Sequence, residues 1–173
     1  MALRTLLQST TETVQDLILA AEERYWEALE LMVQGHPFVG IYLAGYTAEM
    51  LLKTAAFRFD GARPGDFVAP RLAPAKHYGN SFFPHVAFES AHSLRFWAAF
   101  LEQKRAAAGN PLPNSLAIEL NQRVDRMHTT WWVSMRYRSA AVASTVSTAI
   151  QAETIDLLDD VDWLRKHNTD LWS

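Results

Sequence analysis

The sequence predicts an all-α protein, a bundle of about five helices. Three observations support this prediction. Apolar residues recur at intervals of three and four in several long segments, and no segment alternates with the period of two that is typical of strands. Seven glycines and seven prolines are too few for the many turns of a β-sandwich. With 173 residues, 49% of them hydrophobic, the chain is expected to form one domain over residues 1–173, with its core over about 10–166.

The first predicted helix begins near Ser9, because Ser9-x-x-Glu12 has the form of a capping box. An apolar stripe with the helical period follows, and Gly35-His36-Pro37 ends the helix. The stripe consists of Val14, Leu17, Ile18, Ala21, Tyr25, Ala28, Leu29 and Met32.

The second predicted helix covers residues 39–59 and is apolar on nearly all sides, so we expect it to be buried. Two charged residues interrupt it, Glu49 and Lys53. They are four residues apart with the glutamate first, which is the favourable order for an ion pair on one helical face. Burying charge is costly unless the charge is paired or used. The pair is therefore either structural, which we favour, or part of a binding site.

Residues 60–90 contain Pro and Gly at seven positions, which break any long regular element. We therefore expect a long Pro/Gly-rich loop after the second helix. A loop of this length in a compact domain is usually functional or mobile.

Three further helices are predicted after this loop. The third covers about 90–108, with Leu94, Trp97, Ala98 and Leu101 facing inward, and Gly109-Asn110-Pro111 ends it. The fourth begins after Pro113-Asn114, and the fifth begins near Ser139. The fifth carries an apolar stripe and a run of acids that lie mostly on its outer side, Glu153, Asp156, Asp159, Asp160 and Asp162.

Composition excludes several classes of protein. The chain has no cysteine, which rules out disulfides and thiolate metal sites and favours a cytoplasmic location. Its beginning lacks the apolar core of a signal peptide, and no stretch has the length and apolarity of a membrane helix. A net charge of −3 argues against a non-specific DNA-binding protein. His77, His85 and His92 do not have metal-ligand spacing, so we expect no metal and no cofactor.

The segment from Arg123 to Arg138 combines four guanidinium groups, one imidazole and three aromatic rings. Arginine binds phosphate through two parallel hydrogen bonds, aromatic faces stack on bases, and a histidine such as His128 can transfer protons near neutral pH. The structural alternative is that Trp131 and Tyr137 belong to the core while the arginines pair with the acids of 153–162. Both interpretations remain open. The arginines are Arg123, Arg126, Arg136 and Arg138.

Residues 41–59, IYLAGYTAEMLLKTAAFRF, together with ERYWEALELM in the preceding helix, resemble the second and first helices of HEPN domains, the helical higher eukaryote/prokaryote nucleotide-binding-type family. AHSLRFW and MRYRSA resemble the start of the third helix of that family and the Arg-Tyr element before its last helix. The resemblance covers roughly residues 10–160. It implies a helical bundle, a homodimer, and a role in toxin–antitoxin, antiviral or RNA-processing systems. The implied ligands and partners are a nucleotide, RNA, an antitoxin or a nucleotidyltransferase.

The resemblance also implies a possible reaction. Active HEPN proteins are metal-independent endoribonucleases with an Arg-x(4–6)-His motif, and Arg123-Val-Asp-Arg-Met-His128 has that spacing. However, five helical residues rotate two side chains roughly 140° apart, so Arg123 and His128 share no face of a regular helix. Arg136-Tyr137 lies nearer the family position, but no histidine follows it within six residues. The chain is thus closer to HEPN branches without an intact nuclease motif.

Three hypotheses follow. The first is a non-catalytic HEPN-like module that binds a nucleotide, RNA or a protein partner through Arg136, Tyr137, Arg138, Arg126 and the Glu49/Lys53 helix. The second is a ribonuclease in which His128 acts as general acid or base and Arg123 or Arg126 stabilises charge on phosphorus. The third is a purely structural homodimer held by surplus tryptophans. The tryptophans are Trp26, Trp97, Trp131, Trp132, Trp163 and Trp172.

Overall fold

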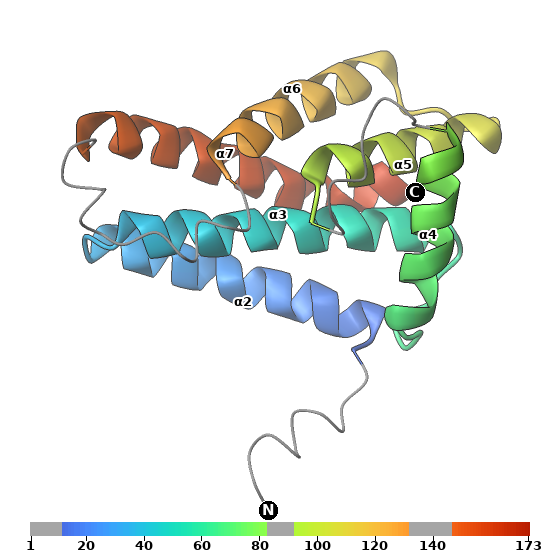
Figure 1. Ribbon diagram of the computed structural model, residues 1–173, viewed down its shortest axis with the longest axis horizontal. Coiled ribbons are helices and arrows are strands. Elements are labelled where there is room, and N and C mark those ends of the chain that lie inside the picture. Colours follow the sequence, from blue (N-terminus) through green and yellow to red (C-terminus); the bar gives the residue numbers. More distant parts are fainter. Residues whose placement is uncertain (1–11, 83–91, 132–146) are drawn as a thin grey trace, which may run out of the picture.

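The computed structural model describes residues 12–82, 92–131 and 147–173, and over these residues the protein is a bundle of six α-helices without a β-strand (Figure 1). The predicted all-α bundle is therefore confirmed. The helices are α2 (Val14–Val33), α3 (Pro37–Phe59), α4 (Ala69–Phe82), α5 (Leu94–Ala107), α6 (Asn114–Thr130) and α7 (Ser147–Trp172).

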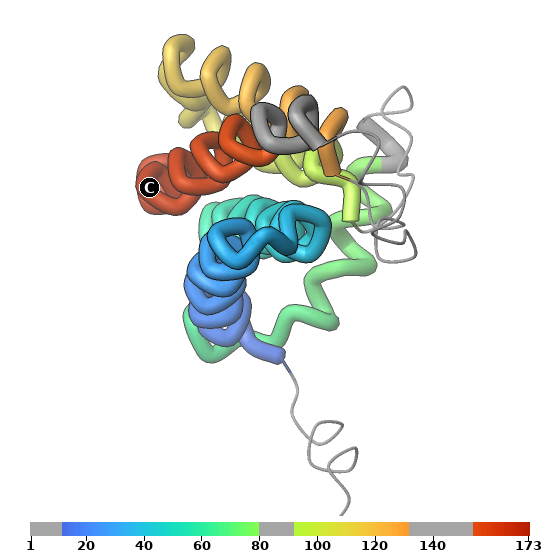
Figure 2. The backbone as a smooth tube through the Cα atoms, turned by 90° about the vertical axis from the view of Figure 1, so that its left-hand side faces the viewer, coloured from blue at the N-terminus to red at the C-terminus, as the bar shows by residue number. Residues whose placement is uncertain are grey.

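Helix α3 is the centre of the bundle. It contacts α2, α5 and α7, while α6 lies over α5 and α7 on the far side from α2 (Figures 1 and 2). The predicted burial of this helix is confirmed, because most of its residues are inaccessible to solvent. Small side chains on several faces let the neighbouring helices approach closely. They include Ala44, Ala48, Ala55 and Ala56, all fully buried.

The capping box of the first described helix lies one turn later than predicted. Thr13 Oγ1 accepts a hydrogen bond from the Asp16 backbone nitrogen at 3.2 Å, and the Asp16 carboxylate accepts one from the Thr13 nitrogen at 2.8 Å. Thr13-x-x-Asp16 serves the same purpose as Ser9-x-x-Glu12, so the pattern alone could not select between them. Ser9 lies outside the described residues, and Glu12 precedes α2.

The predicted loop over 60–90 was wrong in part, because residues 69–82 form α4. Pro70 lies in the first turn, where the missing amide hydrogen costs little, and Pro74 lies at the start of the second turn. Gly79 allows α4 to pack directly on α5, because a Cβ atom at this position would lie 2.1 Å from the Phe96 ring. Packing therefore outweighs the poor helix propensity of this segment.

The remaining helices agree with the sequence predictions where they can be compared. Helix α5 covers most of the predicted 90–108, and α6 begins at Asn114, one residue before the predicted start. Trp97 and Leu101 are buried as expected. The predicted start of the last helix at Ser139 lies outside the described residues, and α7 is described from Ser147. None of the helices in the described part of the chain combines the length and apolarity needed to cross a bilayer.

Candidate functional site

A buried cluster of charged side chains lies between α3 and the start of α5. Glu49 and Lys53 lie one helical turn apart on α3 and form an ion pair, although only 3% of Glu49 and 9% of Lys53 is exposed. The predicted pairing of these two residues is thus confirmed. Nδ1 of His92 lies 2.8 Å from Oε2 of Glu49. We call Glu49, Lys53 and His92 the Glu49 cluster.

The Glu49 carboxylate determines which ring nitrogen of His92 carries the proton. A carboxylate can only accept hydrogen bonds, so the contact with His92 requires the imidazole proton to be on Nδ1. In the neutral ring, Nε2 then carries the lone pair. The His92 side chain is 38% exposed, whereas that of Glu49 is 4% exposed. The cluster therefore connects a buried charge pair to a group that solvent or a ligand can reach.

Aromatic rings surround the Glu49 cluster. The Lys53 ammonium lies 5.4 Å from the centre of the Trp97 ring, within range of a cation–π interaction. The Tyr46 ring packs edge to face against both His92, at 6.0 Å between ring centres, and Trp131, at 5.5 Å. Tyr42 packs on Tyr46 at 4.9 Å. The partly exposed His92 ring is thus packed within a group of aromatic side chains.

The position of Trp131 depends on a glycine. A Cβ atom at Gly45 would lie 2.1 Å from the indole ring, so the ring lies directly on the α3 backbone. Its Nε1 donates a hydrogen bond to the Tyr42 carbonyl at 3.2 Å. Trp131 is 2% exposed, which confirms that it belongs to the core. Trp132 lies outside the described residues.

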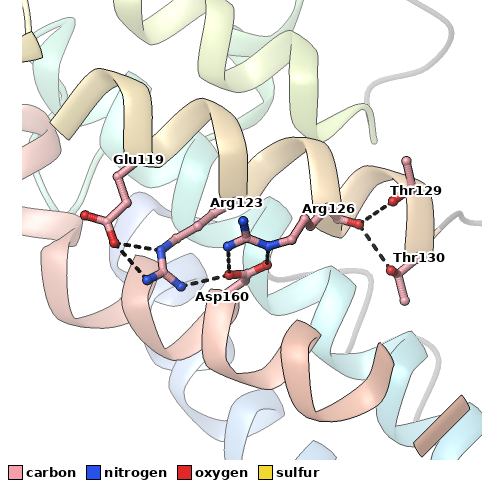
Figure 3. Close-up of polar contacts among 6 residues, drawn as sticks. All are labelled: Glu119, Arg123, Arg126, Thr129, Thr130 and Asp160. Atoms are coloured by element: carbon pink, nitrogen blue, oxygen red, sulfur yellow. Dashed lines mark hydrogen bonds and ion pairs between the residues drawn. The ribbon is translucent and has the colours of Figure 1, made fainter. Parts of the chain in front are cut away.

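Arg123 and Arg126 are held together by one carboxylate from α7 (Figure 3). Asp160 is 1% exposed. Its Oδ1 accepts hydrogen bonds from Arg123 at 2.8 Å and from Arg126 at 2.6 Å, and its Oδ2 accepts one from Arg126 at 3.0 Å. These three residues form the Asp160 clamp, which joins α6 to α7. The hydrogen bond to Asp160 raises the pKa of Arg126 above its ordinary value, although desolvation opposes the shift.

Arg123 is bound on its other side as well. Its guanidinium donates hydrogen bonds to Glu119 at 2.8 and 3.0 Å, and it lies 5.1 Å from the Trp163 ring centre. The Arg123 guanidinium is therefore bound by two carboxylates and packs against an aromatic ring. The alternative in which these arginines pair with the acids of 153–162 is thus realised at Asp160.

The structure does not place Arg123 and His128 of the ribonuclease hypothesis on one face of α6. Helix α6 is regular from Asn114 to Thr130, so Arg123 and His128 lie about 140° apart around its axis. His128 is half-buried. The other predicted binding residues, Arg136, Tyr137 and Arg138, lie outside the described residues. No group of three potential metal ligands occurs in the described part of the chain.

Sequence reasoning did not identify His92 as a site residue. The spacing of the histidines bears only on metal binding, and His92 is 43 residues from Glu49 in the sequence. No spacing rule connects residues so far apart. The available signal was Ser93, a good helix N-cap, which places His92 just before α5.

A groove lies at another place, between the end of α3, α4 and α5. Its volume is about 500 Å³, within the range of small-molecule sites. Lys104 pairs with Asp60 at 2.8 Å across it and lies 4.7 Å from the centre of the Tyr78 ring. The groove is lined by Phe57, Asp60, Pro70, Arg71, Pro74, Ala75, His77, Tyr78, Phe100 and Lys104.

Comparisons of the chain with protein-family models, with curated proteins and with solved structures found no match. The residues of the candidate site are therefore assigned from their geometry.

Proposed function

We propose that this protein is a HEPN-like helical module that binds a nucleotide or a short single-stranded RNA at the Glu49 cluster, without cleaving it. One observation carries the proposal. A buried ion pair is connected through His92 to a partly exposed surface edged by Tyr42 and Tyr46. A buried pair is a weak source of stability, because desolvation offsets most of its attraction. A binding role gives a reason for the charge.

Each part of the site has a chemical task in this proposal. Nε2 of His92 accepts a hydrogen bond from a donor group on a base or from a ribose hydroxyl, and Glu49 holds the His92 ring in place. A base can stack on the face of a tyrosine ring, an interaction worth about 1–3 kcal/mol per base. Arg136, Tyr137 and Arg138 follow Trp131 by five to seven residues. Five to seven residues of chain span at most about 18 to 25 Å, and the proposal adds these groups as ligands, with the two arginines on phosphate.

Binding measurements test the proposal. We expect a fluorescently labelled short RNA or a nucleotide from a panel to bind the wild-type chain and to raise its melting temperature, because a ligand of the folded state stabilises it. His92→Ala and Arg136→Ala should each weaken binding by about fivefold or more, because each variant loses a hydrogen bond to the ligand. Arg95→Ala is the matched control, because Arg95 is an exposed arginine on α5 that pairs with Asp125 at 2.7 Å.

Two results would contradict the proposal. The first is that no member of the panel binds or shifts the melting temperature. The second is that His92→Ala and Arg136→Ala bind as well as Arg95→Ala does.

The ribonuclease hypothesis requires a rearrangement of the contacts of Arg123. Arg123 would have to release Asp160 and Glu119 before it could stabilise a phosphorane-like transition state. The assay is RNA cleavage in EDTA by the wild type and by His128→Ala. Activity that is lost in His128→Ala would favour the ribonuclease over the binding module.

A further inference from the structure

Helix α2 carries three exposed apolar side chains at intervals of seven residues. Leu19 and Trp26 are each 54% exposed, and Val33 is 88% exposed. Residues seven apart lie on nearly the same face of a helix, so these side chains form a row about 21 Å long, which we call the α2 stripe. The opposite face of α2 packs on α3, and α2 forms the lower edge of the bundle in Figure 1.

Trp26, in the middle of the α2 stripe, is held in a fixed orientation. Its Nε1 donates a hydrogen bond to Glu22 at 2.8 Å, and its ring packs edge to face on Tyr25 with 5.2 Å between ring centres. Arg165 of α7 lies 5.7 Å from the ring centre and also binds Glu22. An exposed but immobilised tryptophan loses little entropy on binding, which is the property of an interface hot spot.

Acidic side chains border the α2 stripe. Glu23 is four residues after Leu19 and three before Trp26, and Glu30 is placed in the same way between Trp26 and Val33. Both are exposed, and the Glu23 side chain retains 69% of its accessible surface. Arg24, the only basic residue in the α2 sequence, forms an ion pair with Glu27 and lies 4.0 Å from the Glu23 carboxylate, so the glutamates on this face outnumber the basic residues. The stripe thus has an acidic border.

These charges and this area argue against a second copy of the chain as the occupant. Two α2 stripes facing each other would bring their glutamates together, and like charges across an interface are costly. A row about 21 Å long and about 10 Å wide offers roughly 200 Å², whereas a stable dimer buries about 800 Å² on each partner. A single helix of complementary charge fits both the dimensions and the acidic border.

We propose that the α2 stripe docks an amphipathic helix of a partner protein, with lysine or arginine flanking the apolar face of that helix. Its apolar residues would pack against Leu19, Trp26 and Val33, and its basic residues would meet Glu23 and Glu30. This proposal is independent of the nucleotide site, which lies on other helices.

The test uses two synthetic peptides of about 21 residues, long enough to cover the stripe. Both carry leucine at the a and d positions of a heptad; one has lysine at e and g, and the other has glutamate there. We expect the lysine peptide to bind the full chain with a Kd below about 100 µM, more weakly at high salt, and the glutamate peptide not to bind. Trp26→Ser should weaken binding of the lysine peptide by about tenfold or more.

Two variants make the result specific. Ile118→Ser is the matched control, because Ile118 is an equally exposed apolar residue on α6, outside the stripe, and its loss should leave binding unchanged. The double variant Glu23→Lys/Glu30→Lys should no longer bind the lysine peptide and should bind the glutamate peptide instead. Circular dichroism confirms that each variant is folded. The side chains replaced in these variants are exposed, so we expect each variant to fold.

Three outcomes would overturn the proposal. One is no binding of the lysine peptide at about 100 µM. Another is equal binding to wild type and Trp26→Ser. The third is a dimer of the chain alone in sedimentation equilibrium that Trp26→Ser dissociates, which would assign the stripe to a second copy.

Discussion

Nδ1 of His92 lies 2.8 Å from the buried carboxylate of Glu49, although the two residues are 43 positions apart in the sequence. Helix α3 supplies the carboxylate, and His92, two positions before α5, supplies the imidazole. This contact joins a local ion pair on α3 to a residue from a distant segment of the chain.

Asp160→Ala should destabilise the protein, because Asp160 accepts hydrogen bonds from two guanidinium groups that join α6 to α7. Loss of a buried acceptor of this kind costs about 1–3 kcal/mol. Urea unfolding measures the change. Asp159→Ala is the control, because Asp159 is exposed on the same helix and should change stability by less than about 0.5 kcal/mol. Equal effects of the two substitutions would show that the Asp160 clamp contributes nothing.

Gly45→Ala should also destabilise the protein. The added methyl group would overlap the Trp131 ring, and overpacking of this kind costs about 1–3 kcal/mol. That cost opposes the gain of up to about 1 kcal/mol that alanine brings to a helix. Gly65→Ala is the control, since nothing lies within 4 Å of its added Cβ. The melting temperature measures stability. An increase for Gly45→Ala would contradict the close packing of Trp131.

Glu102→Gln should stabilise the protein at neutral pH. Burial raises the pKa of Glu102, and the hydrogen bond from Asn121 offsets this only in part. A raised carboxyl pKa in the folded state means that stability is lost as pH rises through the folded value. Glutamine keeps the acceptor for Asn121, which donates at 2.7 Å, and removes the charge. Chemical unfolding at pH 7 and below about pH 4 measures the effect. The gain should be present at pH 7 and absent at the acidic pH, and a loss at pH 7 would contradict it.

Acid should weaken the start of α2 and the connection between α3 and α4. Hydrogen bonds from the Thr13 backbone and side chain lower the pKa of Asp16, and those from the Arg63 backbone and Arg71 lower the pKa of Asp66. A lowered carboxyl pKa contributes stability that is present above the ordinary value of about 3.9 and is lost as pH falls through the folded value.

Asp66→Asn tests this prediction by removing one of the two titrating groups. Stability of the variant, measured between pH 5 and about pH 2, should fall less steeply with acid than that of the wild type. Identical pH dependence of the two proteins would show that Asp66 has no part in it.

Local patterns in the sequence predicted most of the helices and one ion pair. The four-residue spacing of Glu49 and Lys53 predicts their ion pair, because it places both side chains on one face of a helix. The prolines before Asn114 predict that α6 begins near this residue. Contacts between distant segments could not be predicted in this way. The His92–Glu49 contact and the choice of Asp160 among five acids depend on how helices pack, which spacing does not encode.

Helix α4 shows the opposite error. Prolines and glycines predicted a loop there, but Pro70 lies in the first turn, where proline is tolerated, and Gly79 serves close packing on Phe96. The same residue types indicate a loop or a packed helix according to their tertiary contacts, and those contacts lie outside the segment itself.

The most direct test of the proposed binding site is a long-range ¹H–¹⁵N NMR spectrum of the histidine side chains during titration with a short single-stranded RNA. His92→Gln assigns the His92 signals. His36 and His167 are internal controls, because His36 is exposed before α3 and His167 binds the Trp163 carbonyl on α7. The proposal predicts that the His92 ring signals shift with added RNA while those of His36 and His167 do not. Saturable RNA binding that leaves the His92 signals unchanged would contradict it.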